Sequence, residues 1–204
     1  MAKRIGMPAA AGATTMKSRD GATVAGCVVG GPTGSDVATD RDGARVTLRD
    51  GRQVLTRPIR AGDGAALAAA FRQLSTRSKQ LRFGSAPFTL SAAARRHFVD
   101  SVDGVDHVAF AAFDDSGRLV GVARILRYPQ DPETLDVGMA VADDYQGAGL
   151  GHVLSHLLAV HRPRPAKRIM TSVASDNTRV MRLFRAFGAT ATWTSAGIVI
   201  QLSD

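Results

Sequence analysis

One short segment constrains this chain more than any other. It is the run Gln146-Gly147-Ala148-Gly149-Leu150-Gly151, between an apolar strand-like stretch and an apolar helix-like stretch. Three alternating glycines leave backbone N–H groups unshielded, so these groups can approach an anion closely. A helix that begins at the end of the loop adds unpaired amides and the positive end of its dipole. The segment therefore predicts a phosphate or pyrophosphate site where a strand meets a helix.

Two common phosphate-binding loops do not fit this segment. A nucleoside-triphosphatase loop requires Gly-Lys-Ser/Thr, but His152 follows Gly151. A dinucleotide-binding fingerprint requires a glycine at its sixth place, which is again His152 when counted from Gly147. The segment also follows the third strand of a predicted meander and does not belong to an opening βαβ unit. Both classes are excluded.

The rest of the chain predicts a mixed α/β fold, in which helices cover the faces of a sheet. A hairpin is expected around Asp50-Gly51, because the flanking residues alternate in polarity. The other elements follow from hydrophobic periodicity: helices over 61–75, 91–100, 152–162 and 178–188, strands over 106–113, 118–126, 134–142 and 168–174, and a β stretch over 191–202.

Composition sets the limits within which these elements must fold. The chain has 204 residues, of which 45% are hydrophobic, enough for one large domain with a core. Residues 1–43 show no sustained period and are interpreted as a flexible N-terminal arm before a domain at 44–204. No apolar run reaches the roughly 20 residues of a membrane span, and no secretory signal is evident at the N-terminus. We therefore expect a cytoplasmic protein.

Cysteine and charge exclude further classes. Cys27 is the only cysteine, so neither an intrachain disulfide framework nor a multi-cysteine zinc site can form. The net charge of +8 is concentrated at the N-terminal end, where residues 1–60 carry 10 basic and 5 acidic groups. No aromatic residue lies in a basic cluster there, which argues against nucleic-acid binding.

The pattern Gln-x-x-Gly-x-Gly at the end of a central strand resembles the pyrophosphate loop of the GNAT superfamily of N-acetyltransferases. The resemblance extends over roughly residues 46–204. Asp176-Asn177, before a helix that ends Phe184-Arg-Ala-Phe187-Gly188, is similar to the second cofactor-side segment of that superfamily. This resemblance implies a mostly antiparallel mixed sheet, splayed at the cofactor strand and flanked by about four helices.

A closer resemblance concerns the acetyltransferase module of bacterial protein-lysine acetyltransferases. It rests on three segments: Arg57 to Asp63, Leu74 to Phe83, and Val120-Gly121-Val122-Ala123-Arg124. Some of those enzymes carry a fused cyclic-nucleotide-binding or acyl-CoA-ligase-like domain, and the residues before the core are too few for either. The resemblance implies a protein lysine as the favoured acceptor.

The same resemblance implies acetyl-CoA as the donor and assigns residues to it. The pyrophosphate would lie on the backbone amides of Gln146, Gly147, Ala148, Gly149, Leu150, Gly151 and His152. The pantetheine arm would pair with the strand edge near Met139 and Val141, and Asn177 would meet the cofactor from the side.

Asp136 is the candidate general base. A lysine amine with a pKa of about 10.4 is only about one part in a thousand neutral near pH 7.4, so a base is needed. Asp136 lies mid-strand where the protein-acetylating relatives have a glutamate, and a carboxylate in an apolar strand is costly unless it is functional or paired. The alternative is an outward-facing surface aspartate. Because aspartate is one methylene shorter than glutamate, a bridging water becomes more necessary.

Other candidates are interpreted structurally. Asp143 and Asp144 are expected to flank a solvated bulge, and Tyr145 is expected to be structural. Phe184 occupies a position where many superfamily members have a tyrosine that protonates the leaving thiolate, and phenylalanine lacks that proton.

Metal binding is not expected. His152 and His156 share one helix face but lack the glutamate of a zinc-protease signature. Arg82 and Arg124 are treated as surface residues, with contact to acceptor or cofactor as the alternative.

Three other functions stay open from sequence alone. The acceptor could be a small-molecule amine, which changes only the acceptor loops. The chain could be a non-catalytic acyl-CoA-binding regulatory module. A nucleic-acid-binding protein that uses the basic arm would show a steep salt dependence of binding.

Overall fold

The computed structural model describes residues 43–83, 92–171, 173, 177–186, 190–194 and 197–201. The predicted arm over 1–43, apart from Gly43, lies outside the described residues, as do Cys27, Asp176 and Gly188.

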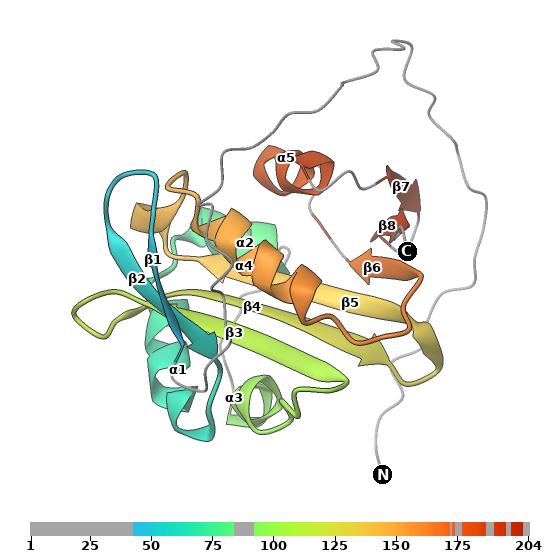
Figure 1. The fold of residues 1–204 in the computed structure, drawn as a ribbon, viewed down its shortest axis with the longest axis horizontal. Helices are drawn as coiled ribbons and strands as arrows, with labels where there is room; N and C mark the ends of the chain where they lie inside the picture. Colours follow the sequence, from blue (N-terminus) through green and yellow to red (C-terminus); the bar gives the residue numbers. More distant parts are fainter. Residues whose placement is uncertain are drawn as a thin grey trace.

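Within these residues, eight strands form one sheet in the order β1-β2-β3-β4-β5-β6-β8-β7 (Figure 1). Their bounds are β1 Ala44–Thr47, β2 Gln53–Pro58, β3 His107–Phe113, β4 Leu119–Tyr128, β5 Asp131–Val141, β6 Arg168–Thr171, β7 Thr190–Thr194 and β8 Gly197–Gln201. Neighbouring strands are antiparallel except β5 and β6, which run parallel. The predicted mixed, mostly antiparallel sheet is confirmed.

Helices cover both faces of the sheet. Their bounds are α1 Gly64–Gln73, α2 Thr76–Phe83, α3 Ala92–Val99, α4 Leu150–Val160 and α5 Thr178–Ala186, with short 3-10 turns at Ala61–Asp63 and Asp143–Tyr145. In Figure 1, α1 and α3 lie together on one side of the sheet and α4 lies on the other. Two apolar cores result, because each strand between them contributes alternate side chains to opposite faces.

The core beneath α4 is built on leucines at helical spacing. Leu150, Leu154, Leu157 and Leu158 of α4 pack against Ile125 and Leu135 of the sheet. The second core joins Leu67 and Phe71 of α1 and Val99 of α3 to Ala109, Ala111 and Phe113 of β3. Leu67, Leu150 and Leu154 have no exposed surface. The first core matters most for function, because it anchors the start of α4 next to the glycine loop.

The predicted turns are present. Gly51 has φ 85° in the β1–β2 hairpin, and Gly117 has φ 79° after Asp114 in the β3–β4 turn. The carboxylate of Asp114 accepts hydrogen bonds from the backbone N–H groups of Ser116 and Arg118, both at 3.0 Å, which fixes that turn.

Three expectations about the elements need correction. The sequence did not predict α2, because its residues TRSKQLRF form no apolar stripe. The strands predicted over 118–126 and 134–142 are longer than expected and are joined by a short turn, since β4 continues to Tyr128 and β5 begins at Asp131. The final β stretch is two strands, β7 and β8, which pair with each other.

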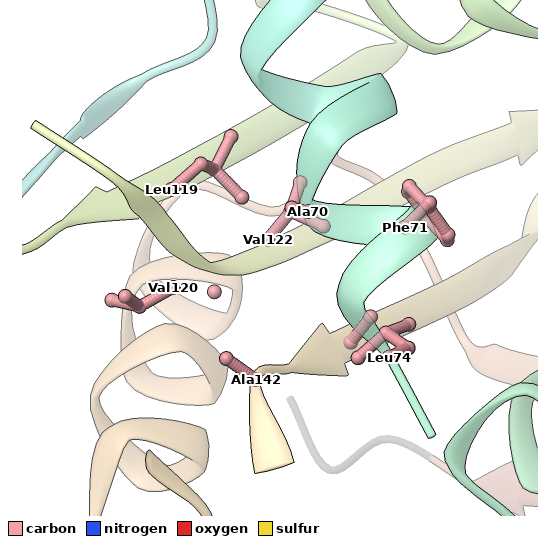
Figure 2. Close-up of a pocket in the computed structure, with 9 residues that line it drawn as sticks. Ala70, Phe71, Leu74, Leu119, Val120, Val122 and Ala142 are labelled. Carbon is pink, nitrogen blue, oxygen red and sulfur yellow. The ribbon is translucent and has the colours of Figure 1, made fainter. Parts of the chain in front are cut away.

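A small cavity separates α1 from the ends of β4 and β5 (Figure 2). Its volume is about 10 Å³, room for at most one water molecule. The labelled side chains around it, from Ala70 and Phe71 to Val122 and Ala142, are all apolar. It is a packing void and not a polar binding site.

Candidate active site

A larger cavity opens where β5 and β6 diverge. Among the described residues, the two strands pair only at Thr134↔Arg168 and Leu135↔Ile169. Further along, the Thr171 hydroxyl donates to the carbonyl of Val137 at 2.8 Å. Beyond this link lies a cavity of about 400 Å³. The expected splay at this strand is present.

Five consecutive residues of β5, from Val137 to Val141, line this cavity. Successive side chains of a strand point to opposite faces of the sheet. Five consecutive residues can therefore line the same cavity only if that cavity lies along the edge of the strand, beside its backbone. The β5 edge facing the cavity is thus the part of the backbone that β6 does not cover, and it suits a ligand that carries amides.

The glycine loop forms one end of the cavity. Gly147 and Gly149 have φ values of 86° and 95°, a left-handed conformation that other residues adopt only with strain. Gly149 directly precedes α4, and a Cβ added there would lie 3.3 Å from Cγ of Arg49. The loop is fixed from behind, because the backbone N–H of Arg49 donates to the carbonyl of Ala148 at 3.0 Å.

The structure brings most of the predicted cofactor residues together. Those that line the cavity are Met139, Val141, Gln146, Gly147, Gly149, Gly151, His152 and Asn177. Ala148 and Leu150 do not line it; their side chains are buried in the core beneath α4. For these two residues only the backbone amide remains available as a ligand. The Asn177 side chain accepts from the backbone N–H of Val180 at 3.3 Å, so Asn177 also caps α5.

Gln146 links three elements around the cavity. Its side-chain nitrogen lies 3.1 Å from the Ser78 hydroxyl of α2 and 3.1 Å from the carbonyl of Val141 in β5. Its side-chain oxygen accepts from Arg179 of α5. These contacts hold Gln146 in one position at the entrance to the glycine loop.

Asp143 is exposed, as the sequence suggested, but its carboxylate also makes specific hydrogen bonds to the residues at the start of α2. Its carboxylate accepts from the backbone N–H and the hydroxyl of Ser75, both at 2.8 Å, and from the Ser78 hydroxyl at 2.5 Å. Burial opposes ionisation, but these hydrogen bonds outweigh it and hold the pKa of Asp143 below its usual value. Asp143 thus anchors the start of α2 beside the cavity and is poorly suited to accept a proton.

Tyr145 has the structural role expected of it. It is buried, and the guanidinium groups of Arg52 and Arg118 lie 3.8 and 5.4 Å from its ring centroid. Arg52 also donates to the carbonyl of Asp144 at 2.8 Å, so the β1–β2 hairpin fixes the backbone that leads into the glycine loop.

Three arginines that sequence reasoning missed border the cavity: Arg49 from the β1–β2 hairpin, and Arg179 and Arg182 from α5. Together with the N-terminus of α4, they supply positive charge where a pyrophosphate would lie. The fit to a phosphate-bearing cofactor rests on these groups and on the uncovered edge of β5. No local motif marks Arg49, which lies 100 residues before Gly149 in the chain.

Asp136 lies on β5 before the cavity-lining run, opposite Leu126 of β4. Its side chain is 29% exposed, and its carboxylate is 3.9 Å from Nη2 of Arg124. Burial raises the pKa of Asp136, and the positive charges of Arg124 and Arg82 reduce but do not cancel that effect. The result is a carboxylate that accepts protons more readily than an ordinary aspartate does.

Other predicted positions add little to the site. The Phe184 side chain lies outside the described residues, although α5 includes its backbone. His156 is exposed, and no group of three His, Cys, Asp or Glu side chains in the described part of the chain could hold a metal ion. No described helix is long and apolar enough to cross a bilayer.

A splayed sheet, a glycine loop at a helix start and a cationic rim together fit a donor substrate that carries phosphate and amide groups. The model for the acetyltransferase (GNAT) family matches residues 69–189. The chain belongs to this family.

Three relatives extend the comparison. The chain is 35% identical to Acetyltransferase PA5475 of Pseudomonas aeruginosa over 140 residues, 67% of this chain and 74% of that protein. It is 26% identical to Acetyltransferase Pat of Mycolicibacterium smegmatis over 161 residues, 78% of this chain but only 48% of Pat. The solved GNAT domain of S. lividans PAT superposes with a TM-score of 0.68 at 28% identity, covering 78% of this chain and 95% of that domain.

Proposed function

We propose that this chain is an acetyl-CoA-dependent N-acetyltransferase in which an amine attacks the thioester directly, with a protein lysine as the favoured acceptor. The observation that carries the proposal is the arrangement along β5. The glycine loop lies at one end of an uncovered strand edge, and Asp136, with its raised pKa, lies toward the other.

The cofactor side follows from the geometry of the cavity. The amides of the glycine loop, Arg49 and Arg179 would hold the pyrophosphate, and the β5 edge near Met139 and Val141 would pair with the amides of the pantetheine arm. Acetyl-CoA supplies a thioester carbonyl as the electrophile.

Asp136 has the role of general base. The acceptor arrives as an ammonium ion, and Asp136 takes its proton, through a water molecule because the aspartate side chain is short. A new C–N bond then forms, the C–S bond breaks, and the electron pair of that bond leaves with the thiolate. Burial of Asp136 favours this role, because a base with a higher pKa holds the abstracted proton more firmly.

A protein-lysine acceptor is supported by the similarity to Acetyltransferase Pat and to the GNAT domain of S. lividans PAT. Because the chain covers about half of Pat, this acceptor is inferred for the shared part alone. A small-molecule amine would require the same base and the same cofactor contacts.

Thiol release from acetyl-CoA tests the proposal directly. The purified chain is incubated with acetyl-CoA and panels of lysine peptides, folded proteins and small amines, and free CoA is measured. We expect amine-dependent release that Asp136→Asn lowers by about 10²–10⁴ in kcat, with little change in the Kd of acetyl-CoA. Tight cofactor binding without turnover on any amine would instead indicate a binding module.

A further inference from the structure

Arg124 is a buried arginine in the middle of β4. Its side chain is 14% exposed. Two of its donors, Nε and Nη1, are buried without a hydrogen-bond partner among the residues that the structure describes. Leaving charged donors unpaired away from water is costly, so such groups in a native protein call for an explanation. The sequence-based interpretation of Arg124 as a surface residue is wrong.

Neighbouring side chains hold Arg124 in place but do not accept hydrogen bonds from its Nε and Nη1. The Phe98 ring of α3 lies 4.3 Å from its guanidinium carbon, so one planar face rests on an aromatic surface. Its nearest carboxylate, on Asp136, is 3.9 Å from Nη2, which is an ion-pair distance but too long for a hydrogen bond. Nε and Nη1 are therefore held in place without an acceptor among the described residues, and a ligand would have to displace the side chains that cover them.

A second guanidinium strengthens the positive potential at this place. Arg82 of α2 lies against Gly138, close enough that a Cβ there would collide with it, and Gly138 is the cross-strand partner of Arg124. Burial and, after it, repulsion by Arg124 lower the pKa of Arg82. Arg82, Phe98, Arg124 and Asp136 are called here the Arg124 cluster.

Of the Arg124 cluster, Arg82 is the member that lines the cavity, and it lies against Gly138. Asp136 lies two residues from Gly138 on the same face of β5, in the direction away from the glycine loop. From Asp136 to Val141, beside the loop, is about 17 Å along the strand. An anion bound by Arg124 would thus lie near the proposed base and far from the pyrophosphate.

We propose that the Arg124 cluster binds a carboxylate of the acceptor, close to the amine that receives the acetyl group, with Nε and Nη1 of Arg124 as donors. This inference rests on the proposed function. Arginine pairs well with carboxylates, and a singly charged anion is repelled less by Asp136 than a doubly charged phosphate is. The carboxylate comes from a free amino acid or from an acidic residue beside a target lysine.

Matched acceptors test the inference with the unmodified protein. One arm compares free amino acids with their carboxamides, at equal concentrations of neutral amine. The other compares lysine peptides that carry Glu or Gln next to the lysine. We expect kcat/KM to be at least tenfold higher for the carboxylate member in one arm, and that arm identifies the source. Equal kcat/KM values in both arms would overturn the inference while leaving the proposed function intact. No transfer to any amine would overturn the proposed function, and the inference with it.

Two variants then test whether Arg124 causes the preference for a carboxylate acceptor. Arg124→Met keeps an aliphatic stem on Phe98 but removes the charge, and should reduce the ratio of kcat/KM values for the carboxylate and amide acceptors toward one, mainly through KM. Arg96→Met, at an exposed position of α3, is the matched control and should keep the wild-type ratio. If Arg124→Met lowered kcat/KM equally for the carboxylate and the amide acceptor, Arg124 would have a purely structural role and the inference would be overturned.

Discussion

Asp136 combines a proposed catalytic role with a cost to stability. Because burial raises its pKa, the folded protein favours the protonated carboxyl group. This stabilisation is present at low pH and is lost as the pH rises through the folded-state pKa. Asp136→Asn resembles the protonated form at every pH, so we expect a higher Tm than wild type at pH 7 and no difference near pH 3.

Thermal melts of both proteins across this pH range measure the effect. A lower Tm for Asp136→Asn at pH 7 would mean that attraction to Arg124 outweighs burial. That result would place Asp136 in a structural ion pair and weaken its assignment as a base.

Gly149 is the residue on which the loop geometry most depends. Its φ of 95° strains any side chain, and a Cβ there would meet Arg49. Gly149→Asp also adds negative charge where the pyrophosphate is proposed to bind. We expect the Kd of acetyl-CoA to rise at least tenfold in calorimetry. Gly117→Asp is the control, because Gly117 has a similar φ of 79° but open space around it and does not line the cavity.

Single elements differ in how well the sequence predicts them. The hairpins and α4 follow from local patterns: a turn dipeptide, alternation, or leucines at helical spacing. Helix α2 does not, because its stability depends on a partner 68 residues away, the Asp143 carboxylate that accepts from Ser75. A single sequence contains no signal for such a pairing.

The contact between Asp143 and α2 yields the next prediction. Asp143→Ala removes the acceptor shared by Ser75 and Ser78 and frees one side of Gln146. We expect a loss of about 1–2 kcal/mol in unfolding free energy, as for a lost helix cap, and a several-fold weaker Kd for acetyl-CoA. Because the pKa of Asp143 is lowered, this stability is present at neutral pH and disappears as the pH falls through the folded-state pKa.

The control is Asp144→Ala, whose carboxylate is half exposed and pairs with Arg118. Exposed pairs contribute little, so this variant should resemble wild type in both measurements. If Asp143→Ala and Asp144→Ala lost the same unfolding free energy and the same affinity for acetyl-CoA, a specific role for Asp143 would be contradicted.

The candidate site combines residues that are distant in sequence and that only the topology of the fold brings together. The glycine loop and the β5 residues are contiguous in sequence and were predicted. Arg49, Ser78 and Arg179 reach the same cavity from a hairpin and two helices far apart in the chain. Their convergence depends on the pairing of β5, which follows β4 along its length but, in the described part of the chain, meets β6 at only two positions. No local sequence pattern encodes this difference.

The same topology predicts how the chain responds to truncation. The sheet begins with β1 at Ala44, and both cores are formed by residues from Val46 onward. Deleting residues 1–40 removes none of these contacts, so we expect an unchanged cooperative transition, a Tm within a few degrees of the full chain, and the same Kd for acetyl-CoA. Calorimetry of both forms measures all three. A large drop in Tm would show that residues 22–30, whose apolar run is strand-like, contribute to the folded domain. Retained Tm with altered acceptor preference would instead assign the basic arm to acceptor binding.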